Sequence, residues 1–508
     1  MIKTEKFLNL SENYNLIPVY DEIIADTETP VSLYKQLSDF NDYSFLLESA
    51  SSDNKLNKGR YSFIGIKPEK VIKYNNQKII IQNNNGKNTD IIKDKKINEF
   101  LDTYIKKFNV YEIEDLPPFS GGLVGYFSYE MIDEWEDIYH NRKDKALSQS
   151  NIPDTVLVIA KLVIAYDHLN NTLKIIDNIY LKEELSQKEK INLYNKSKKR
   201  IKKIITKIRN KPVMDKNKIN KNILTGDLKS NTEKEEFKNM VSEAKKHIKE
   251  GDAFQIVLSQ KFSVKTSISP FQVYRALRVS NPSPYMFYLN FPDIKLMGSS
   301  PEVLVKVNDN KVITRPLAGT RKRGKNRKED LDLKNELLND EKEKAEHIML
   351  VDLGRNDLGR VCKTGSIEVT ELLGIEYFTR VMHLVSQVEG EIKDNLSILD
   401  VLSSVFPAGT VSGAPKIRAM EIIDKLEKEP RGVYAGAVGY LDFRGNLDTC
   451  ITIRTFSMKD GVLSAQIGAG MVADSIPEKE YKETLNKAKA LFDALKITRE
   501  EEPYGLSN

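Results

Sequence analysis

The stretch from Pro407 to Lys425 reads Pro-Ala-Gly-Thr-Val-Ser-Gly-Ala-Pro-Lys-Ile-Arg-Ala-Met-Glu-Ile-Ile-Asp-Lys. Its prolines and glycines interrupt any apolar period as far as Gly413, and they predict a loop. Pro415 suits the first turn of a helix, and apolar residues follow at helical spacing: Ile417, Met420, Ile423 and Leu426. Free backbone N–H groups at such a helix start can bind an anion, but a tight loop-to-helix connection explains the same residues.

Composition excludes several classes of protein. The 508 residues are 40% hydrophobic, which supports a full core, and 78 basic against 73 acidic residues leave a net charge of only +5. We therefore expect neither nucleic-acid binding nor, in the absence of a long apolar run, a membrane span. The N-terminus lacks the apolar core of a signal peptide, and two cysteines make neither a disulfide framework nor a zinc set. We expect a cytoplasmic protein.

One tract without an apolar period, rich in lysine and asparagine, divides the chain. The four predicted parts are an N-terminal lobe of residues 1–209, a linker of residues 210–230, a larger domain of residues 231–495, and a tail of residues 496–508. Strands and helices follow in mixed order without steady βαβ alternation, so we predict the α+β class.

Periodicity predicts the main elements of both large parts. Hairpins are expected at residues 71–82, 162–176, 303–315 and 433–456, and helices at residues 181–209, 270–278, 328–352 and from Pro477. Thr232 and Glu235 have the spacing of a capping box, which would begin a further helix. The lysines of residues 181–209 are expected to form the solvated back of a packed helix.

Several acidic residues stand where chemistry is possible. Glu346 lies where a helix becomes strongly apolar, and Glu480 and Glu483 are three apart near the start of the last helix. Carboxylates from two separate helices are what a Mg²⁺ site needs, because Mg²⁺ takes one or two of them and completes its octahedron with water and ligand oxygens. An ordinary surface pair between Glu483 and Lys487 is the alternative.

Motifs along the second half resemble, in order, those of the chorismate-utilising enzymes. The matching positions are Ser300-Pro-Glu302, Pro316-Leu-Ala-Gly-Thr320, Glu346-His347, His383, Pro407 to Pro415 with Thr410, Tyr434, Arg454, Gly468-Ala-Gly470 and Glu480-Tyr-Lys-Glu-Thr484. The resemblance covers nearly all of residues 236–495 and is looser in the N-terminal region. It implies a large two-sheet α/β sandwich with helices on the outside, in which residues 231–495 are the catalytic domain and residues 1–209 a regulatory lobe.

The resemblance also assigns roles around a bound Mg²⁺ ion. Glu346 and Glu483, with Glu480 beside them or acting through water, would hold the ion, which binds the ring carboxylate of chorismate. The ion would draw electron density from the ring as the C4–O bond breaks. Glu302 would be the general acid that protonates the departing hydroxyl, which requires a raised pKa.

The remaining matched residues would bind the substrate. Arg454, Tyr434 and backbone N–H groups of Gly468, Ala469 and Gly470 would hold the enolpyruvyl carboxylate, and Lys487 would face the ring carboxylate. Thr320 and Thr410 would position the ring, with His383 beside it. A hydrogen-bonded core histidine is the alternative for His383.

Two positions separate the branches of the family. Gln255 stands where isochorismate- and salicylate-forming members have a lysine that activates water, and Ala318 stands where aminodeoxychorismate-forming members have a lysine that adds to the ring. The resemblance is therefore to the anthranilate synthase component I branch, which makes anthranilate and pyruvate from chorismate and ammonia in the first committed step of tryptophan biosynthesis. Aminodeoxychorismate synthase component I is the nearest rival.

A third group of residues resembles the family's tryptophan-inhibition site. Its members are Glu48, Ser49, Pro284, Tyr285, Met286, Val438, Tyr440 and Asp448. Carboxylates there could pair with an α-amino group while apolar side chains line an indole slot. Ordinary packing between lobes explains the same residues. A non-catalytic tryptophan sensor is another alternative, but it would not need Glu302, Glu346 and Glu483.

A source of ammonia is missing from this sequence, since neither Cys362 nor Cys450 stands in the setting of a glutaminase nucleophile. The resemblance implies a separate glutamine amidotransferase subunit, and a heterotetramer of two large and two small subunits. The small-molecule partners implied are chorismate, ammonia and tryptophan.

Overall fold

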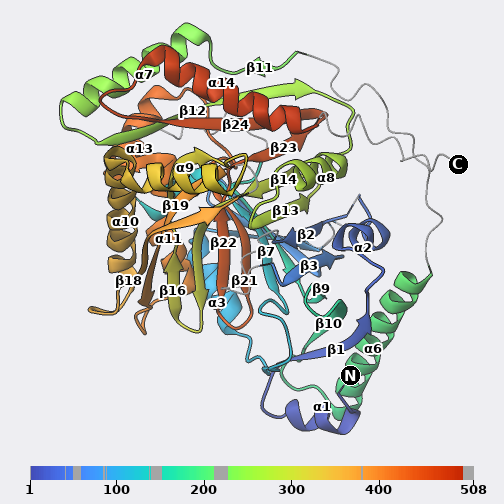
Figure 1. Ribbon diagram of the computed structural model, residues 1–508. Helices are drawn as coiled ribbons and strands as arrows, with labels where there is room; N and C mark the ends of the chain where they lie inside the picture. Colours follow the sequence, from blue (N-terminus) through green and yellow to red (C-terminus); the bar gives the residue numbers. More distant parts are fainter. Residues whose placement is uncertain are drawn as a thin grey trace, which may run out of the picture.

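The computed structural model describes residues 2–40, 42–49, 59–83, 86, 89–136, 138, 152–210, 227–378 and 381–495. Two 12-stranded antiparallel sheets form its centre, and most helices lie outside them (Figure 1). A cluster of buried residues from both sheets joins their inner faces, with Phe45 and Phe287 from one and Tyr126 and Val438 from the other. The structure thus confirms the predicted two-sheet sandwich with helices on the outside.

The first sheet combines strands from both halves of the chain. In spatial order it contains β1 (Leu16–Ile24), β10 (Thr172–Tyr180), β9 (Leu162–Asp167), β3 (Tyr61–Ile66), β2 (Ser44–Glu48), β13 (Tyr285–Asn290), β14 (Lys295–Ser300), β23 (Thr455–Lys459), β24 (Val462–Met471), β12 (Gln255–Lys265) and β11 (Lys229–Ser230), while β20 (Gly413–Ala414) pairs with β12. The two halves of the chain meet where β2 pairs with β13.

The second sheet is also shared between the halves. Its order is β17 (Leu317–Lys322), β19 (Val381–Glu391), β16 (Lys311–Thr314), β15 (Val303–Asn308), β22 (Leu447–Ile451), β21 (Ala437–Asp442), β7 (Gly122–Phe127), β8 (Thr155–Ala160), β4 (Lys70–Asn75), β5 (Lys78–Asn83) and β6 (Asp90–Lys93), while β18 (Glu368–Tyr377) pairs with β19. Here the halves meet where β7 pairs with β21. Hydrogen bonding therefore continues across the predicted division between the lobes.

Helices cover the sheets and join their strands. They are α1 (Thr4–Leu10), α2 (Pro30–Leu37), α3 (Ile97–Lys106), η2 (Tyr129–Met131), α4 (Ile132–Trp135), α6 (Gln187–Arg209), α7 (Lys234–Lys249), α8 (Pro270–Ser280), α9 (Arg327–Asn339), α10 (Glu341–Val361), α11 (Ile398–Val405), α12 (Gly409–Ser412), α13 (Lys416–Leu426) and α14 (Pro477–Asp493). No helix in the described ranges is long and apolar enough to cross a membrane.

The predicted hairpins form as β4–β5, β9–β10, β15–β16 and β21–β22. The last one is shorter than predicted, because β22 ends at Ile451 and the chain then crosses to β23 in the other sheet. The basic helix forms as α6 with its isoleucines buried, and the last helix begins at Pro477 as expected. Residues 211–226 of the predicted linker and residues 496–508 of the predicted tail lie outside the described residues.

Three local predictions were wrong. The Thr232 hydroxyl bonds to the side chain of Asn231, so α7 has Glu233 as its N-cap, without a side-chain cap. The single helix expected at residues 328–352 is two helices, because Asp340 caps a new one by accepting hydrogen bonds from the N–H groups of Lys342 and Glu343. The loop expected as far as Gly413 contains a short helix, α12 (Gly409–Ser412).

Candidate functional site

Two connections that cross between the sheets bring the predicted acid and a guanidinium together. Glu302 lies between β14 of the first sheet and β15 of the second, and Arg454 lies between β22 of the second sheet and β23 of the first. Arg454 is close enough to influence the pKa of Glu302. Its backbone has φ +49°, a left-handed conformation uncommon for a non-glycine residue. Such strain is often found where surrounding structure fixes a functional side chain.

The Glu302 carboxyl group is buried and sparsely hydrogen-bonded. Thr410 of α12 donates its hydroxyl to the carboxyl oxygens at 3.2 Å, and the Leu317 N–H donates at 3.4 Å. Burial raises the pKa of Glu302 to about 8, against the lowering effects of Leu317, Thr410 and Arg454. Glu302 is therefore mostly protonated at neutral pH, as a general acid must be.

His383 of β19 is held beside β17. Its Nδ1 lies 3.0 Å from the carbonyl oxygen of Gly319 and 3.0 Å from the hydroxyl of Thr320. Because a carbonyl oxygen only accepts, Nδ1 carries the proton and Nε2 keeps its lone pair. Burial, followed by the charge of Arg454, lowers the pKa of His383 to about 4, so the ring is neutral at physiological pH. Ala318, the position expected to separate the branches of the family, precedes this pair in β17 and lies opposite Leu384.

A chain of contacts joins strands β12 and β24 to helices α10 and α14. The Gln255 amide donates to Glu346 at 2.9 Å, and it lies so close to Gly470 that an added Cβ there would be 2.8 Å from its nitrogen. At Gly468 an added Cβ would be 2.3 Å from the Tyr434 hydroxyl. Both glycines therefore let a polar side chain approach the backbone of β24.

The same strand leads to α14. Lys487 donates to the carbonyl oxygen of Gly468 at 3.3 Å and pairs with Glu483 at 2.7 Å. Ala469, between the two glycines, is buried in the opposite direction, in a core cluster with α7 and α13. The structure thus gathers Gln255, Glu346, Gly468, Gly470, Tyr434, Lys487 and Glu483 along one connected path.

The predicted metal residues lie beside other acidic groups. Burial and the charge of Glu483 raise the pKa of Glu480, against the lowering effects of Ser475, Lys487 and Lys342. On α10, burial and the charge of Glu346 raise the pKa of Glu343. Like charges thus lie next to one another on each of the two helices, and carboxylates are the ligands Mg²⁺ takes. The residues present therefore fit Mg²⁺ in donor chemistry.

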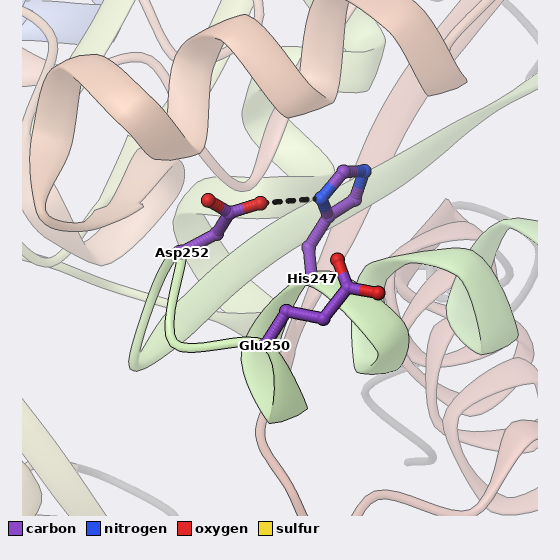
Figure 2. Close-up of side chains that lie close together, drawn as sticks. All are labelled: His247, Glu250 and Asp252. Carbon is purple, nitrogen blue, oxygen red and sulfur yellow. Dashed lines mark hydrogen bonds and ion pairs between the residues drawn. The ribbon is translucent and has the colours of Figure 1, made fainter.

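A different cluster brings three ligand atoms closest together. In the described ranges one set of three or more His, Cys, Asp or Glu has ligand atoms within 4.8 Å of one another: His247, Glu250 and Asp252 (Figure 2). His247 Nδ1 lies 2.7 Å from the Asp252 carboxylate, which also pairs with Arg418 at 2.9 Å. Arg418 and His247 lower the pKa of Asp252. Arg418 already supplies the cation, so the cluster is accounted for without a metal.

The predicted tryptophan residues meet in two neighbouring contacts between strands. Met286 lies opposite Glu48 where β13 pairs with β2, and Ser49 follows Glu48 at the end of that strand. Across the sandwich, the Tyr285 hydroxyl donates to Asp448 at 2.8 Å. Pro284, which precedes Tyr285, and Val438 of β21 are both buried. Tyr440, also in β21, lies opposite Asp448 of β22.

Sequence reasoning missed the groups that hold these residues. The carboxylate of Glu48 accepts hydrogen bonds from the Tyr274 hydroxyl and, at 3.0 Å, from Arg278, both on α8. Beneath Tyr434, the buried Arg431 pairs with Glu427 at 2.7 Å, and its guanidinium lies 5.6 Å from the centre of the Tyr434 ring. The contacts of Glu48 with α8 join residues far apart in the sequence, so no local pattern signals them. Glu427 and Arg431 are four apart but lie beyond the end of α13, so their spacing does not stand out either.

Comparison with known proteins places the chain in a family. The family model described as chorismate binding enzyme matches residues 42–493, and the chain therefore belongs to that family.

Within the family, the chain resembles anthranilate synthase component 1 over almost its whole length. It is 44% identical to the protein of that name from Aquifex aeolicus over 501 residues, covering 98% of each chain, and 45% identical to that from Acetivibrio thermocellus, covering 96% of each. The crystal structure of anthranilate synthase component I from Streptococcus pneumoniae superposes with a TM-score of 0.74 at 37% identity, covering 92% of this chain and 98% of that one. A menaquinone-specific isochorismate synthase from Escherichia coli, at 19% identity and a TM-score of 0.69, shares the fold over 97% of this chain and 100% of its own.

Proposed function

We propose that the chain converts chorismate and ammonia into anthranilate and pyruvate, as its relatives' name implies. One observation carries the proposal: the buried Glu302 has a pKa of about 8 and lies close to Arg454. A protonated acid near a fixed cation suits a substrate that carries both a leaving hydroxyl and a carboxylate. The full-length likeness to anthranilate synthase component 1 supports the choice of product.

In the proposed mechanism Glu302 gives its proton to the C4 hydroxyl of chorismate, which leaves as water while ammonia adds at C2. Thr410, which donates to the Glu302 carboxyl at 3.2 Å, keeps that acid oriented. The enolpyruvyl carboxylate is held by Arg454 and Tyr434 and by the N–H groups of Gly468 and Gly470. Because these two glycines have no side chains, the carboxylate can approach the backbone of β24 closely. The neutral His383 has Nε2 free to take the C2 proton as pyruvate departs.

Magnesium is the proposed cofactor. Bound by Glu346 and Glu483, with Glu480 beside them or acting through water, Mg²⁺ would supply a Lewis acid at the ring carboxylate. Gln255, which donates to Glu346 at 2.9 Å, keeps that carboxylate directed toward β12 and β24. Lys487 would exchange its contact with Glu483 for the ring carboxylate of the substrate, because it is a flexible cation at the same rim.

Two further proposals concern partners and control. A separate glutamine amidotransferase subunit, the component II that the relatives' name implies, would supply ammonia, and the assembly would contain two copies of each subunit. Tryptophan would bind between Glu48 and Asp448 and inhibit by favouring one arrangement of the sheets. Its ammonium group would share Glu48 with Arg278, which now lies 3.0 Å from that carboxylate.

One assay tests the proposal. The purified chain is given chorismate, Mg²⁺ and an ammonium salt, and anthranilate is followed by fluorescence without any added lyase. Anthranilate should form, it should require Mg²⁺, and glutamine alone should not replace ammonium. A product that becomes fluorescent only after a lyase is added would identify the aminodeoxychorismate-forming rival instead. Ligand binding without any turnover would favour a non-catalytic sensor.

A further inference from the structure

A large cavity lies on the far side of the molecule from the candidate active site. Its volume is about 950 Å³, and it lies between α6 and the first sheet, where β10 ends and β9 begins. Figure 1 shows α6 beside β1 and β10, well away from α10 and α14, which carry the proposed metal residues. Nothing in the proposed reaction uses this cavity.

The walls of the cavity are strongly basic. Helix α6 contributes Lys196, Arg200, Lys203 and Lys207, while the sheet and its loops contribute Lys67, Lys161 and Lys182. Glu69 and Asp177 are the carboxylates in the lining. The lining therefore has an excess of five positive charges.

Most of these cations lack an internal partner. Lys161 pairs with Glu69 at 2.5 Å and Arg200 with Asp177 at 3.1 Å. Within the described part of the chain, none of the other five forms an ion pair, although Lys207 donates to a backbone carbonyl. Like charges held together without counter-ions raise the local potential, and a concave wall focuses it.

A neighbouring lysine, Lys107, has a lowered pKa. Burial, followed by the charges of Lys70 and Lys161, lowers the pKa of Lys107 to about 8. The ammonium groups of Lys107 and Lys161 both lie within 6 Å of the centre of the Tyr180 ring, which lines the cavity. The positive charge of the lining residue Lys161 therefore reaches Lys107 beside the end of β10.

The floor of the cavity is apolar. Leu37, Ile66, Leu162, Ile179 and Ile204 line it and are each less than 10% exposed. A closed apolar floor beneath a basic rim fits a small molecule with an apolar body and several anionic groups, whereas a long polyanion would need an open stripe. The volume lies in the range of small-molecule sites. We propose that this cavity binds an organic polyanion of about nucleotide size.

Matched double variants of α6 test this proposal. The cavity variant, Lys196→Glu with Lys203→Glu, replaces two positive side chains of the lining with negative ones. The control variant, Lys199→Glu with Lys202→Glu, makes the same change in net charge at exposed lysines of α6 that do not line the cavity. ATP is titrated calorimetrically in a metal-free buffer with chelator, so that it cannot bind through a divalent ion. Helix content and the unfolding temperature of each variant confirm that it folds.

The proposal expects saturable binding of ATP to the wild-type protein, and weaker binding at high salt. The cavity variant should weaken ATP binding at least about tenfold, and the matched control less than about threefold. Tripolyphosphate should bind more weakly than ATP, because it lacks an apolar body. Absence of saturable ATP binding, equal losses in the two double variants, or tripolyphosphate binding as tightly as ATP would each overturn the proposal.

Discussion

Glu302 and Glu48 are both buried carboxylates, but the molecule surrounds them differently. Glu302, at a crossing between the sheets, has a hydroxyl and a backbone N–H in hydrogen-bonding distance, and burial dominates its protonation. Glu48, at the end of β2, lies 3.0 Å from the guanidinium of Arg278 and accepts from Tyr274. Burial with little compensation produces an acid that can give a proton, whereas burial beside a cation produces an ion pair that a charged ligand can enter.

The largest expected effect lies at Glu302. Glu302→Gln keeps the shape of the side chain but removes its acidic proton, so kcat for anthranilate formation should fall by about 10²- to 10⁴-fold. The measurement is steady-state fluorescence at saturating chorismate and ammonium, with a thermal melt to show that folding is intact. Retention of more than about a tenth of the activity would mean that another group protonates the leaving hydroxyl.

Loss of the cation beside Glu48 should change the stability of the fold rather than the chemistry of the reaction. Arg278→Met leaves the buried Glu48 without its cation and should cost roughly 2–3 kcal/mol, below the full penalty of a buried pair because Arg278 is partly exposed. Urea unfolding would measure it. Arg275→Met, on the exposed side of the same helix, is the matched control and should change stability by no more than about 0.5 kcal/mol. Equal effects in the two variants would argue against a structural ion pair.

The pH dependence of turnover sharpens the contrast. The reaction needs protonated Glu302, so kcat should be constant below its pKa of about 8 and fall about tenfold for each pH unit above it. Total ammonium is adjusted at each pH to keep free ammonia constant, since free ammonia itself increases with pH. An activity that continued to rise through pH 9 under those conditions would be incompatible with Glu302 as the acid.

The smallest expected effect concerns Ser49. Ser49→Ala removes one hydroxyl beside Glu48, so the tryptophan concentration for half-inhibition should rise by about 2- to 10-fold, the value of one hydrogen bond. Turnover without tryptophan should be unchanged, because the groups that hold the Glu302 carboxyl are Thr410 and Leu317, not Ser49. Unaltered inhibition would remove Ser49 from the proposed tryptophan site.

Sequence patterns predicted much of this fold, but only where neighbouring residues carry the information. Hairpins such as β9–β10 follow from two apolar runs joined by a short turn. The break at Asp340 could also have been found from a helix-capping residue followed by acidic residues. The pairing of β2 with β13 joins residues about 240 positions apart, and no local pattern encodes such a contact.

In the candidate site, too, the sequence identified single residues but not their surroundings. Motifs pointed to Glu302, Glu346 and Arg454 one by one, but their environments arise only in the folded chain. The contact between Gln255 and Glu346 needs β12 to lie beside α10, and the raised pKa of Glu302 needs both sheets to exclude water. Protonation states are therefore properties of the fold that sequence patterns do not reveal.

The central claim, a protonated Glu302 inside the sandwich, can be measured directly by infrared difference spectroscopy between the wild-type protein and Glu302→Gln. The account predicts a carboxylic acid C=O band in the wild-type protein at pH 7 that is absent in the variant and disappears as the pH is raised through about 8. A carboxylate signal for Glu302 already at pH 6, with no C=O band, would contradict it.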